Sequence, residues 1–347
     1  MFEEIAKTQA GWLSGDGEES LVVLSSRIRL ARNIAGMKFP TSADRKTREK
    51  VLEYFDSAVE RSDFLNGGKF YRIEGVDDAD SNFLVERHLI SPTMLMNLQS
   101  CGVYIGSDRD VSIMVNEEDH LRIQAITTGF EMDRTMEQAA QFDNEVGRLL
   151  EYDYDSDFGF LTACPTNVGT GLRASVLIHL PGLVLTREID SMIQKINKMG
   201  LAVRGFYGEG TDVLGNLFQI SNQRTLGKSE PDILEDIERV TRIIISDEAV
   251  ARDRLKEEAF DHICDKIWRA YGILKYAKVL SSDEVMNLLS AVRLGVAMGI
   301  IDFLPISIIN EILLLSQPAH LVKYYEKDLN PEERDVLRAT MVREKLS

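Results

Sequence analysis

The fold is decided by residues 111–122, in which the run Val-Ser-Ile-Met-Val is followed directly by Asn-Glu-Glu-Asp-His-Leu-Arg. The largely alternating pattern of residues 111–115 predicts a half-buried strand. Residues 116–122 then place three carboxylates and an arginine at the end of that strand, where burial is costly without partners. Carboxylates can hold a cation or accept a proton, and arginine can hold phosphate in a fixed fork. This stretch is therefore a candidate site, and the alternative is a solvated, charged turn.

Length and composition are typical of an ordinary globular protein. The chain has 347 residues, enough for a sizeable core and two domains, with 44% hydrophobic and 28% charged residues. Its net charge of -16 argues against non-specific binding to nucleic acid or anionic membranes, so we expect neither as a partner. A local arginine cluster could still reverse the field within one cleft.

The distribution of cysteines and of apolar residues indicates a cytoplasmic protein. The N-terminus has neither a basic region nor an apolar core typical of a signal peptide. Cys101, Cys164 and Cys264 are odd in number and far apart, which favours a reducing compartment without disulfides. The apolar region 286–315 is interrupted by charged residues such as Arg293, so we expect buried or dimer-forming helices rather than a membrane span.

The order of predicted elements indicates an α+β fold with an antiparallel sheet flanked by helices, followed by an all-helical C-terminal domain. Residues 102–105 and 111–115 flank a polar turn and predict a hairpin. The other expected strands start at residue 21 or cover 69–73, 122–127, 158–163, 173–180, 201–206 and 217–221. The expected helices before residue 252 are 43–62, 80–88, 135–152, 186–199 and 230–251. We therefore divide the chain into an N-terminal segment (1–20), a catalytic domain (21–251) and a helical domain (252–347).

Two arginines in the first strand are a second candidate. If residues 25–32 are extended, Arg27 and Arg29 lie on one face, with Ile28 and Leu30 on the other. Two adjacent guanidinium groups repel unless an anion lies between them. The alternative is a pair of exposed surface arginines.

Other unusual residues complete a possible constellation. Arg122, Arg173 and Arg204 are near strand ends or loops, as are Glu118 and Glu209. Converging cations would bind a polyphosphate, and two carboxylates would suit a planar cation that must lose a proton. Together they indicate phosphoryl transfer from ATP to a guanidinium, a reaction that depends mainly on positioning and charge neutralisation.

Five blocks carry a family resemblance, namely residues 25–29, 116–122, 164–176, 204–209 and 220–227. Over about residues 20–252 the chain resembles the phosphagen (ATP:guanido) kinases. It departs from the metabolite kinases of that family in three respects. Few residues precede the first block, Gly210 replaces a histidine, and a helical region follows the catalytic domain. These departures resemble the bacterial branch that phosphorylates arginine on proteins, since an open site can accept a protein side chain.

The resemblance implies roles for individual residues. Glu118 and Glu209 would orient the guanidinium, one of them acting as base, and a thiolate of Cys164, favoured by nearby arginines, would help. The alternative for Cys164 is a small buried hydrophobe, and for His88 an ordinary histidine near a helix end. The implied nucleotide-binding residues are Ser25, Ser26, Arg27, Arg29, His88, Arg122, Arg173, Ser175, Leu177, Arg204 and Gly208.

A last motif lies near the C-terminus. Arg334 and Arg338 are four residues apart and share one helix face, with Asp335 between them. The resemblance implies a phosphoarginine pocket for allosteric self-activation. The alternative is a solvated face with ordinary ion pairs.

The resemblance also implies cofactors and partners. It implies ATP with Mg²⁺ bound mainly through the phosphates and no metal site made by the protein. The apolar helices expected in residues 286–315 suggest a homodimer interface. The expected partners are substrate proteins, an activator with zinc-binding modules, a heat-shock repressor, and an AAA+ unfoldase whose protease degrades the marked proteins. Two other hypotheses remain: a kinase of free arginine, and a non-enzymatic adaptor that only binds phosphoarginine.

Overall fold

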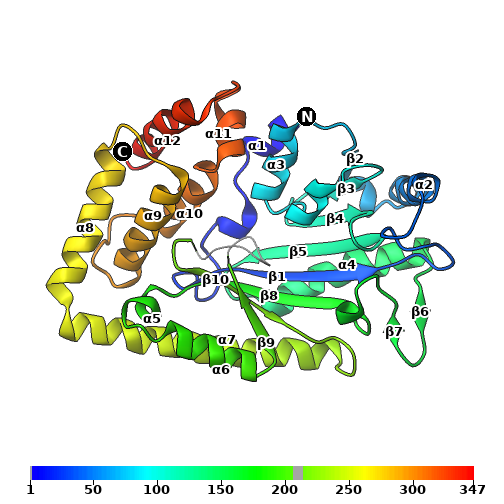
Figure 1. The fold of residues 1–347 in the computed structure, drawn as a ribbon, viewed down its shortest axis with the longest axis horizontal. Helices are drawn as coiled ribbons and strands as arrows, with labels where there is room; N and C mark the ends of the chain where they lie inside the picture. The colour runs from blue at the N-terminus through cyan, green and yellow to red at the C-terminus, as the bar shows by residue number, and fades with distance from the viewer. Residues whose placement is uncertain (1, 206–213) are drawn as a thin grey trace.

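The computed structural model describes residues 2–205 and 214–347. Within these residues, the catalytic part is built on an eight-stranded antiparallel sheet with the order β2-β3-β4-β5-β1-β8-β10-β9 (Figure 1). Its strands are β1 (Val23–Arg32), β2 (Lys69–Arg72), β3 (Gly102–Ile105), β4 (Val111–Val115), β5 (Leu121–Thr128), β8 (Leu172–His179), β9 (Leu201–Arg204) and β10 (Leu217–Asn222). The predicted hairpin is confirmed, because β3 pairs with β4. The α+β prediction is confirmed as well.

Long helices cover one face of this sheet, where α4 contacts β1 and β5 and α7 contacts β8 and β10. The main core lies between them and includes Ile28 and Leu30 of β1. The helices before the C-terminal part are α1 (Glu3–Ala6), α2 (Arg45–Arg61), α3 (Asp78–Glu86), α4 (Met132–Leu149), α5 (Pro181–Leu185), α6 (Ile189–Lys198) and α7 (Glu230–Glu258). Four short 3-10 helices are η1 (Gly11–Leu13), η2 (Leu65–Gly67), η3 (Pro92–Met96) and η4 (Pro165–Asn167).

The predicted alternation of β1 is confirmed. Ile28 and Leu30 are fully buried against the helices, whereas Arg27 and Arg29 are only partly buried on the other face. Because successive side chains of a strand point to opposite faces, β1 supplies both the core and the base of a cleft.

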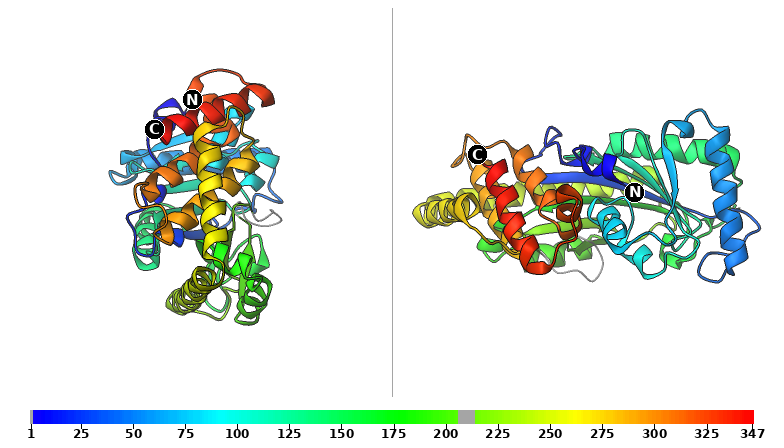
Figure 2. Two further views of the ribbon diagram at one scale, coloured as in Figure 1. Left: turned by 90° about the vertical axis from the view of Figure 1, so that its left-hand side faces the viewer. Right: turned by 90° about the horizontal axis from the view of Figure 1, so that it is seen from above.

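The C-terminal part is helical, as predicted, and packs across one end of the sheet (Figure 2). Its helices are α8 (Phe260–Tyr276), α9 (Ser282–Ala297), α10 (Ile306–Leu315), α11 (Pro318–Tyr325) and α12 (Pro331–Lys345). Their core also contains Leu24, Ile126 and Leu177 from the sheet. Most apolar side chains of α9 and α10 are buried in this core. The apolar character of residues 286–315 is thus accounted for within one chain, and it gives no support to the expected dimer interface.

The expected boundary at residues 251 and 252 falls inside α7, which continues to Glu258. At this point buried Glu248 accepts hydrogen bonds from the amides of Gly182 (2.9 Å) and Leu183 (3.0 Å) and from Arg252 Nε (2.7 Å). This carboxylate therefore ties the first turn of α5 to α7. The predicted strand 173–180 does end before Pro181, since β8 ends at His179. Proline is tolerated in a first helical turn, and α5 begins there.

One predicted strand is much shorter than expected. Residues 158–163 contribute only β7 (Gly159–Phe160), which pairs with β6 (Tyr154–Asp155) in a separate two-stranded hairpin. The amide of Leu161 still donates to Asp153 O (3.0 Å), but Leu161 O accepts a hydrogen bond from Asn33 Nδ2 (3.0 Å), and the pairing goes no further.

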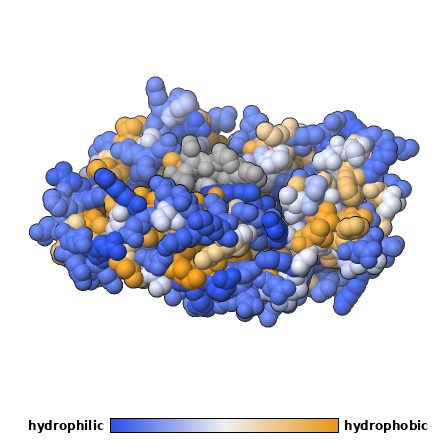
Figure 3. Space-filling model, turned by 60° about the horizontal axis from the view of Figure 1, so that its bottom comes forward, coloured by the Kyte–Doolittle hydropathy of each residue, from blue (hydrophilic) through white to orange (hydrophobic). Residues whose placement is uncertain are grey.

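The face of the molecule shown in Figure 3 is mainly hydrophilic, with separate apolar areas. Among the helices of the described residues, none combines the length and apolar character needed to cross a bilayer.

Candidate active site

A cleft of about 630 Å³ lies on the sheet face opposite α4 and α7, and side chains from both halves of the sheet line it. The structure brings most of the predicted catalytic and nucleotide-binding residues together there. They are Arg27, Arg29, His88, Glu118, Arg122, Cys164, Arg173 and Arg204. Glu209 and Gly208 lie outside the described residues.

The strand register explains why the arginines converge. Arg29 of β1 is paired directly with Arg173 of β8, and Arg122 lies on β5, the neighbour of β1 on its other side. Burial, together with repulsion from Arg173 and Arg122, lowers the pKa of Arg27 to about 10. Burial and the same neighbours, with Arg27, lower the pKa of Arg29 well below its usual range.

This cation cluster is electrostatically incomplete. Arg29 Nε is buried and has no hydrogen-bond partner among the described residues. Nearby like charges and burial both disfavour the charged form, and a bound anion would offset them by stabilising that form. The cluster is therefore suited to bind a polyanion such as a nucleotide triphosphate.

The turn of residues 116–120 fixes the acidic side of the cleft. Asn116 has a left-handed backbone (φ 61°), which asparagine adopts more readily than most residues. Its Nδ2 donates to Arg48 O (2.8 Å) and Ser100 O (2.9 Å), and its amide donates to His120 O (2.9 Å). These bonds anchor the turn so that Glu118 points into the cleft.

Arg122 connects two carboxylates. It contacts Glu118 Oε2 (3.0 Å) and Glu117 Oε2 (2.7 Å), and Glu117 also accepts a hydrogen bond from Ser91. Burial raises the pKa of Glu118, Asp119 and Glu117 raise it further, and Arg122 opposes them. A carboxylate with a raised pKa is a better general base near neutral pH. Sequence reasoning gave no role to Glu117, which positions Arg122.

Asp119 joins this turn to the cysteine loop. Its Oδ1 accepts hydrogen bonds from Asn33 Nδ2 (2.7 Å) and from the amide of Ala163 (2.6 Å). The next residue, Cys164, lines the cleft, and its Sγ lies 3.0 Å from Thr166 Oγ1. Asp119 thus holds Glu118 and Cys164 on the same side of the cleft, a role that its sequence position did not reveal.

The turn Gly169-Thr170-Gly171 requires its second glycine because the backbone passes close to β1 there. Gly171 has φ 63°, and a Cβ there would lie 2.6 Å from Ala31 O of β1. Only glycine allows this approach. The turn therefore seats the loop against β1, which accounts for its glycine without a phosphate.

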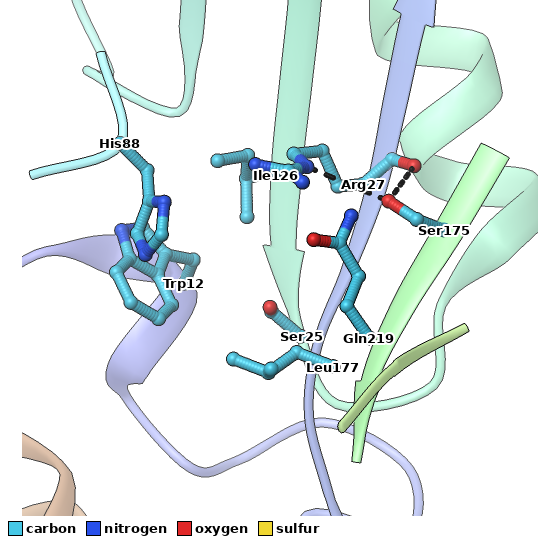
Figure 4. A pocket seen from close by; sticks show the side chains of 8 residues that line it. All are labelled: Trp12, Ser25, Arg27, His88, Ile126, Ser175, Leu177 and Gln219. Carbon is cyan, nitrogen blue, oxygen red and sulfur yellow. Dashed lines mark hydrogen bonds between the residues drawn. The ribbon is translucent and has the colours of Figure 1, made fainter. Parts of the chain in front are cut away.

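A smaller pocket adjoins the cleft and shares Arg27, His88 and Gln219 with it (Figure 4). It encloses about 20 Å³. The remaining lining residues include the predicted Ser25, Ser175 and Leu177, together with Trp12 and Ile126. The Trp12 and His88 rings meet edge to face, with centroids 4.9 Å apart. Burial, with repulsion from Arg27 and Arg29, lowers the pKa of His88 to about 3, so its ring is neutral.

Two sequence predictions need comment. Ser26 stays a prediction as a nucleotide-binding residue, but its side chain points to the face of β1 opposite the cleft. There its Oγ donates to Gly129 O (2.9 Å) and accepts from the amide of Glu131 (3.0 Å). Trp12 was missed, because nothing in its surroundings in the sequence indicates a contact with residues of the sheet.

The predicted phosphoarginine motif lies on α12. Arg338 is buried, with 2% of its surface exposed. Its Nε donates to Ser316 O (2.7 Å), and Nη1 donates to Leu280 O (2.8 Å) and to Asp335. Arg338 therefore has a structural role that its spacing did not predict, while Arg334 is only half-buried.

Comparison with known proteins gives a consistent result. Residues 50–251 match the ATP:guanido phosphotransferase C-terminal catalytic domain, and residues 260–347 match the protein-arginine kinase McsB C-terminal domain. The chain is 44% identical to a protein-arginine kinase of Desulforamulus reducens over 99% of this chain and 98% of the relative. It is 44% identical to a protein-arginine kinase of Bacillus cereus (strain G9842), over 97% and 95%.

Solved structures show the same fold. A lombricine kinase superimposes with a TM-score of 0.59 and 27% identity, over 70% of each chain. A duplicated taurocyamine kinase from Schistosoma mansoni superimposes with a TM-score of 0.60 over 80% of this chain and 41% of that one. At 24% identity, the second match speaks for the fold alone.

Proposed function

Because the chain belongs to the ATP:guanido phosphotransferase family, and within it to the protein-arginine kinases, we propose that it transfers the γ-phosphoryl group of ATP to arginine side chains of proteins. The observation that carries this proposal is the cleft in which clustered arginines, two of them with lowered pKa, meet a carboxylate of raised pKa. The arginines suit the phosphates, and the carboxylate suits the guanidinium that accepts the phosphoryl group.

The cation cluster supports the phosphate side of this proposal. Arg27, Arg29 and Arg173 would bind the triphosphate of ATP and neutralise charge as the γ-phosphoryl group leaves. The described residues contain no cluster of three or more acidic, histidine or cysteine side chains that could hold a metal ion. We therefore propose that Mg²⁺ is bound mainly through phosphate oxygens, where it would add to the charge neutralisation.

The acceptor guanidinium would lie on the side of the cleft that holds Glu118 and Cys164. Glu118 would orient it and Glu209 would grip it from the other side, and one of them would remove the proton from the attacking nitrogen. Cys164, held near Glu118 through Asp119, would help fix the orientation. The proposal assigns the base to this pair of glutamates without choosing between them.

The pocket of Figure 4 suits the nucleoside end of ATP. It combines apolar surface from Ile126 and Leu177 with polar edges from Ser25, Ser175 and Gln219. Trp12 Nε1 is buried without a hydrogen-bond partner among the described residues, so a base acceptor could pair with it. The small volume means that the ring of Trp12 or His88 would move outward on binding.

The experiment measures ADP release from Mg-ATP with casein, with free arginine, and with neither. Turnover with casein alone supports the proposal. Turnover with free arginine instead would show a metabolite kinase, and no turnover with any arginine-containing protein would show an adaptor. A Glu118→Gln variant provides the matched control for contaminating ATPases.

Regulation by phosphoarginine is also part of the proposal. Arg334, which is half-buried, and Asp335 would contact the phosphate and guanidinium of a phosphoarginine, with Arg338 holding Asp335 in place. Free phosphoarginine should then stimulate turnover, and Arg334→Ala should remove that stimulation while leaving basal turnover intact. Stimulation that survives in the variant would exclude this pocket.

We further propose that the protein marks substrates for an AAA+ unfoldase and its protease in the stress response and acts on a heat-shock repressor, with an activator that carries zinc-binding modules. The cleft of about 630 Å³ has room for an arginine side chain, which supports action on protein substrates. Pull-down of each partner class by the purified chain tests it. A homodimer is proposed too, and the exposed Trp268 and Phe303 are apolar surface that it could cover. A monomer by light scattering would exclude it.

A further inference from the structure

A second cavity, separate from the cleft, encloses about 340 Å³. It lies where the N-terminal segment meets the end of α3 and helices α10, α11 and α12. Figure 1 shows α1 beside α11 in this region. Its volume falls within the range of small-molecule sites, about 300–1,000 Å³, and none of the roles proposed above uses it.

The charged lining is predominantly cationic. Among the described residues, its cations are Lys7, Arg87, Lys323 and Lys345, and its carboxylate is Glu311, 2.7 Å from Lys345 Nζ. Lys7 and Lys323 also pair with carboxylates outside the lining, Glu326 (3.3 Å) and Asp80. Within the described residues, Arg87 forms no ion pair, so it is the cation of the lining that lacks a carboxylate partner. Arg87 is only 4% exposed, and burial with repulsion from Arg109 lowers its pKa to about 10. A negative charge in the cavity would reverse that effect.

The rest of the wall is apolar. Leu13, Leu314 and Leu315 line the cavity together with the ring of Tyr324. An inorganic anion would leave this surface uncovered, and a neutral apolar molecule would leave the buried guanidinium of Arg87 without an ion-pair partner. The lining therefore matches an anion carried on an apolar body.

Residues 86–88 link the lining of this cavity to the lining of the pocket in Figure 4. Arg87 Nη2 donates to Thr8 O (2.7 Å), and both residues line the cavity. The next residue after Arg87 is His88, which packs on Trp12. Before it, Glu86 accepts from the amides of Ala319 (2.8 Å) and His320 (2.9 Å) at the start of α11. Three consecutive residues thus join α11, the cavity and the pocket.

We propose that this cavity binds a small amphiphilic anion, a phosphate or carboxylate on an aromatic or aliphatic body, and that its occupancy changes the affinity of the neighbouring pocket for nucleotide. A ligand between Arg87 and α10 would shift the contact of Arg87 with Thr8, and with it the seating of Trp12 on His88. The coupling rests on the proposed nucleotide site, whereas binding of the anion does not, so the two can fail separately.

Isothermal titration calorimetry of the full chain tests the binding. The probes are 2-naphthyl phosphate and 2-naphthoate, which separate the two anion sources, with 2-naphthol as the neutral control. Saturating Mg-ADP keeps the probes out of the catalytic cleft. Lys7→Gln with Lys345→Gln removes two cations of the cavity, of which Lys7 is exposed and Lys345 partly exposed, and Glu311→Gln removes its carboxylate. Lys327→Gln, an exposed lysine outside the lining, is the matched control.

We expect at least one anionic probe to bind and 2-naphthol not to bind. The double lysine variant should weaken binding by about tenfold, and Glu311→Gln should tighten it by about threefold, as expected for partly screened charges at short range. Lys327→Gln should bind as the wild type does. Equal affinity in all variants, or no binding of either anion, would overturn the proposal.

The coupling is read from the Kd for ADP with and without the bound probe. A change of threefold or more that disappears in the double lysine variant is expected, and linkage requires the same factor for the probe. An unchanged Kd for ADP would refute the coupling.

Discussion

Replacing Arg27 with methionine should make the nucleotide-free protein more stable while weakening nucleotide binding. Arg27 is held among Arg29, Arg122 and Arg173, and its pKa is lowered from 12.5 to about 10. A base with a lowered pKa in the folded state destabilises that state at every pH below the folded value, and the cost is relieved only as pH rises above it. The full cost is therefore present at neutral pH.

The pKa difference corresponds to an upper limit of about 3 kcal/mol at pH 7. Part of this gain is lost, because methionine forfeits the contact of Arg27 Nε with Ser175 Oγ (3.4 Å) and some packing. We expect a net stabilisation of about 1 to 2 kcal/mol. Methionine is the suitable replacement because it keeps an unbranched apolar stem.

Urea unfolding of both proteins, with and without Mg-ATP, measures the effect. Without nucleotide the variant should have the higher midpoint at an unchanged slope, and added salt should narrow the difference. With saturating Mg-ATP the order should reverse, since the wild type gains more from binding. A nucleotide-free variant that is less stable than the wild type would refute the claim that the cluster is electrostatically strained.

Three further predictions follow from the site and its supports. In Glu118→Gln the chain should stay folded by circular dichroism while kcat falls about 100-fold or more. If Glu118 is the base, the wild-type kcat/KM should fall as pH drops through a value above 4.5, because the pKa of Glu118 is raised. A fall in kcat/KM that begins only at or below pH 4.5 would contradict this. Asp119→Ala leaves the amide of Ala163 and Asn33 Nδ2 without their acceptor, so urea unfolding should show a loss of about 2 kcal/mol, and an unchanged midpoint would remove its supporting role. Arg338→Met should lower the free energy of unfolding by about 3 kcal/mol, because it leaves two buried carbonyls without a donor. Arg334→Met, at a half-buried position, should change it by no more than about 0.5 kcal/mol. Similar losses in both variants would show that burial does not distinguish the two arginines.

Local patterns in the sequence were enough to predict the parts of the site that depend on strand geometry. The alternation of β1 predicted that Arg27 and Arg29 share a face opposite to Ile28. The same rule argues against Ser26, which was included because it belongs to the same motif as Ser25. Period-two geometry proved a better guide here than adjacency in the sequence.

The remaining features depend on contacts between distant parts of the chain. Trp12 meets His88 across 76 residues, and Asp119 joins the cysteine loop across 44. No local pattern encodes either contact. The apolar character of residues 286–315 was evident, but its partner was not, and that partner is the chain's own second core. Spacing likewise placed Arg334 and Arg338 on one face without showing that Arg338 is buried.

The most direct test of the proposed activity is mass spectrometry of casein incubated with the chain and Mg-ATP, with every step at neutral or mildly alkaline pH to preserve an N–P bond. We predict phosphate on arginine with the wild type and none with Glu118→Gln or with Glu209→Ala, each of which should remain folded. Phosphate on serine or threonine, or arginine phosphate that persists in both variants, would contradict the account.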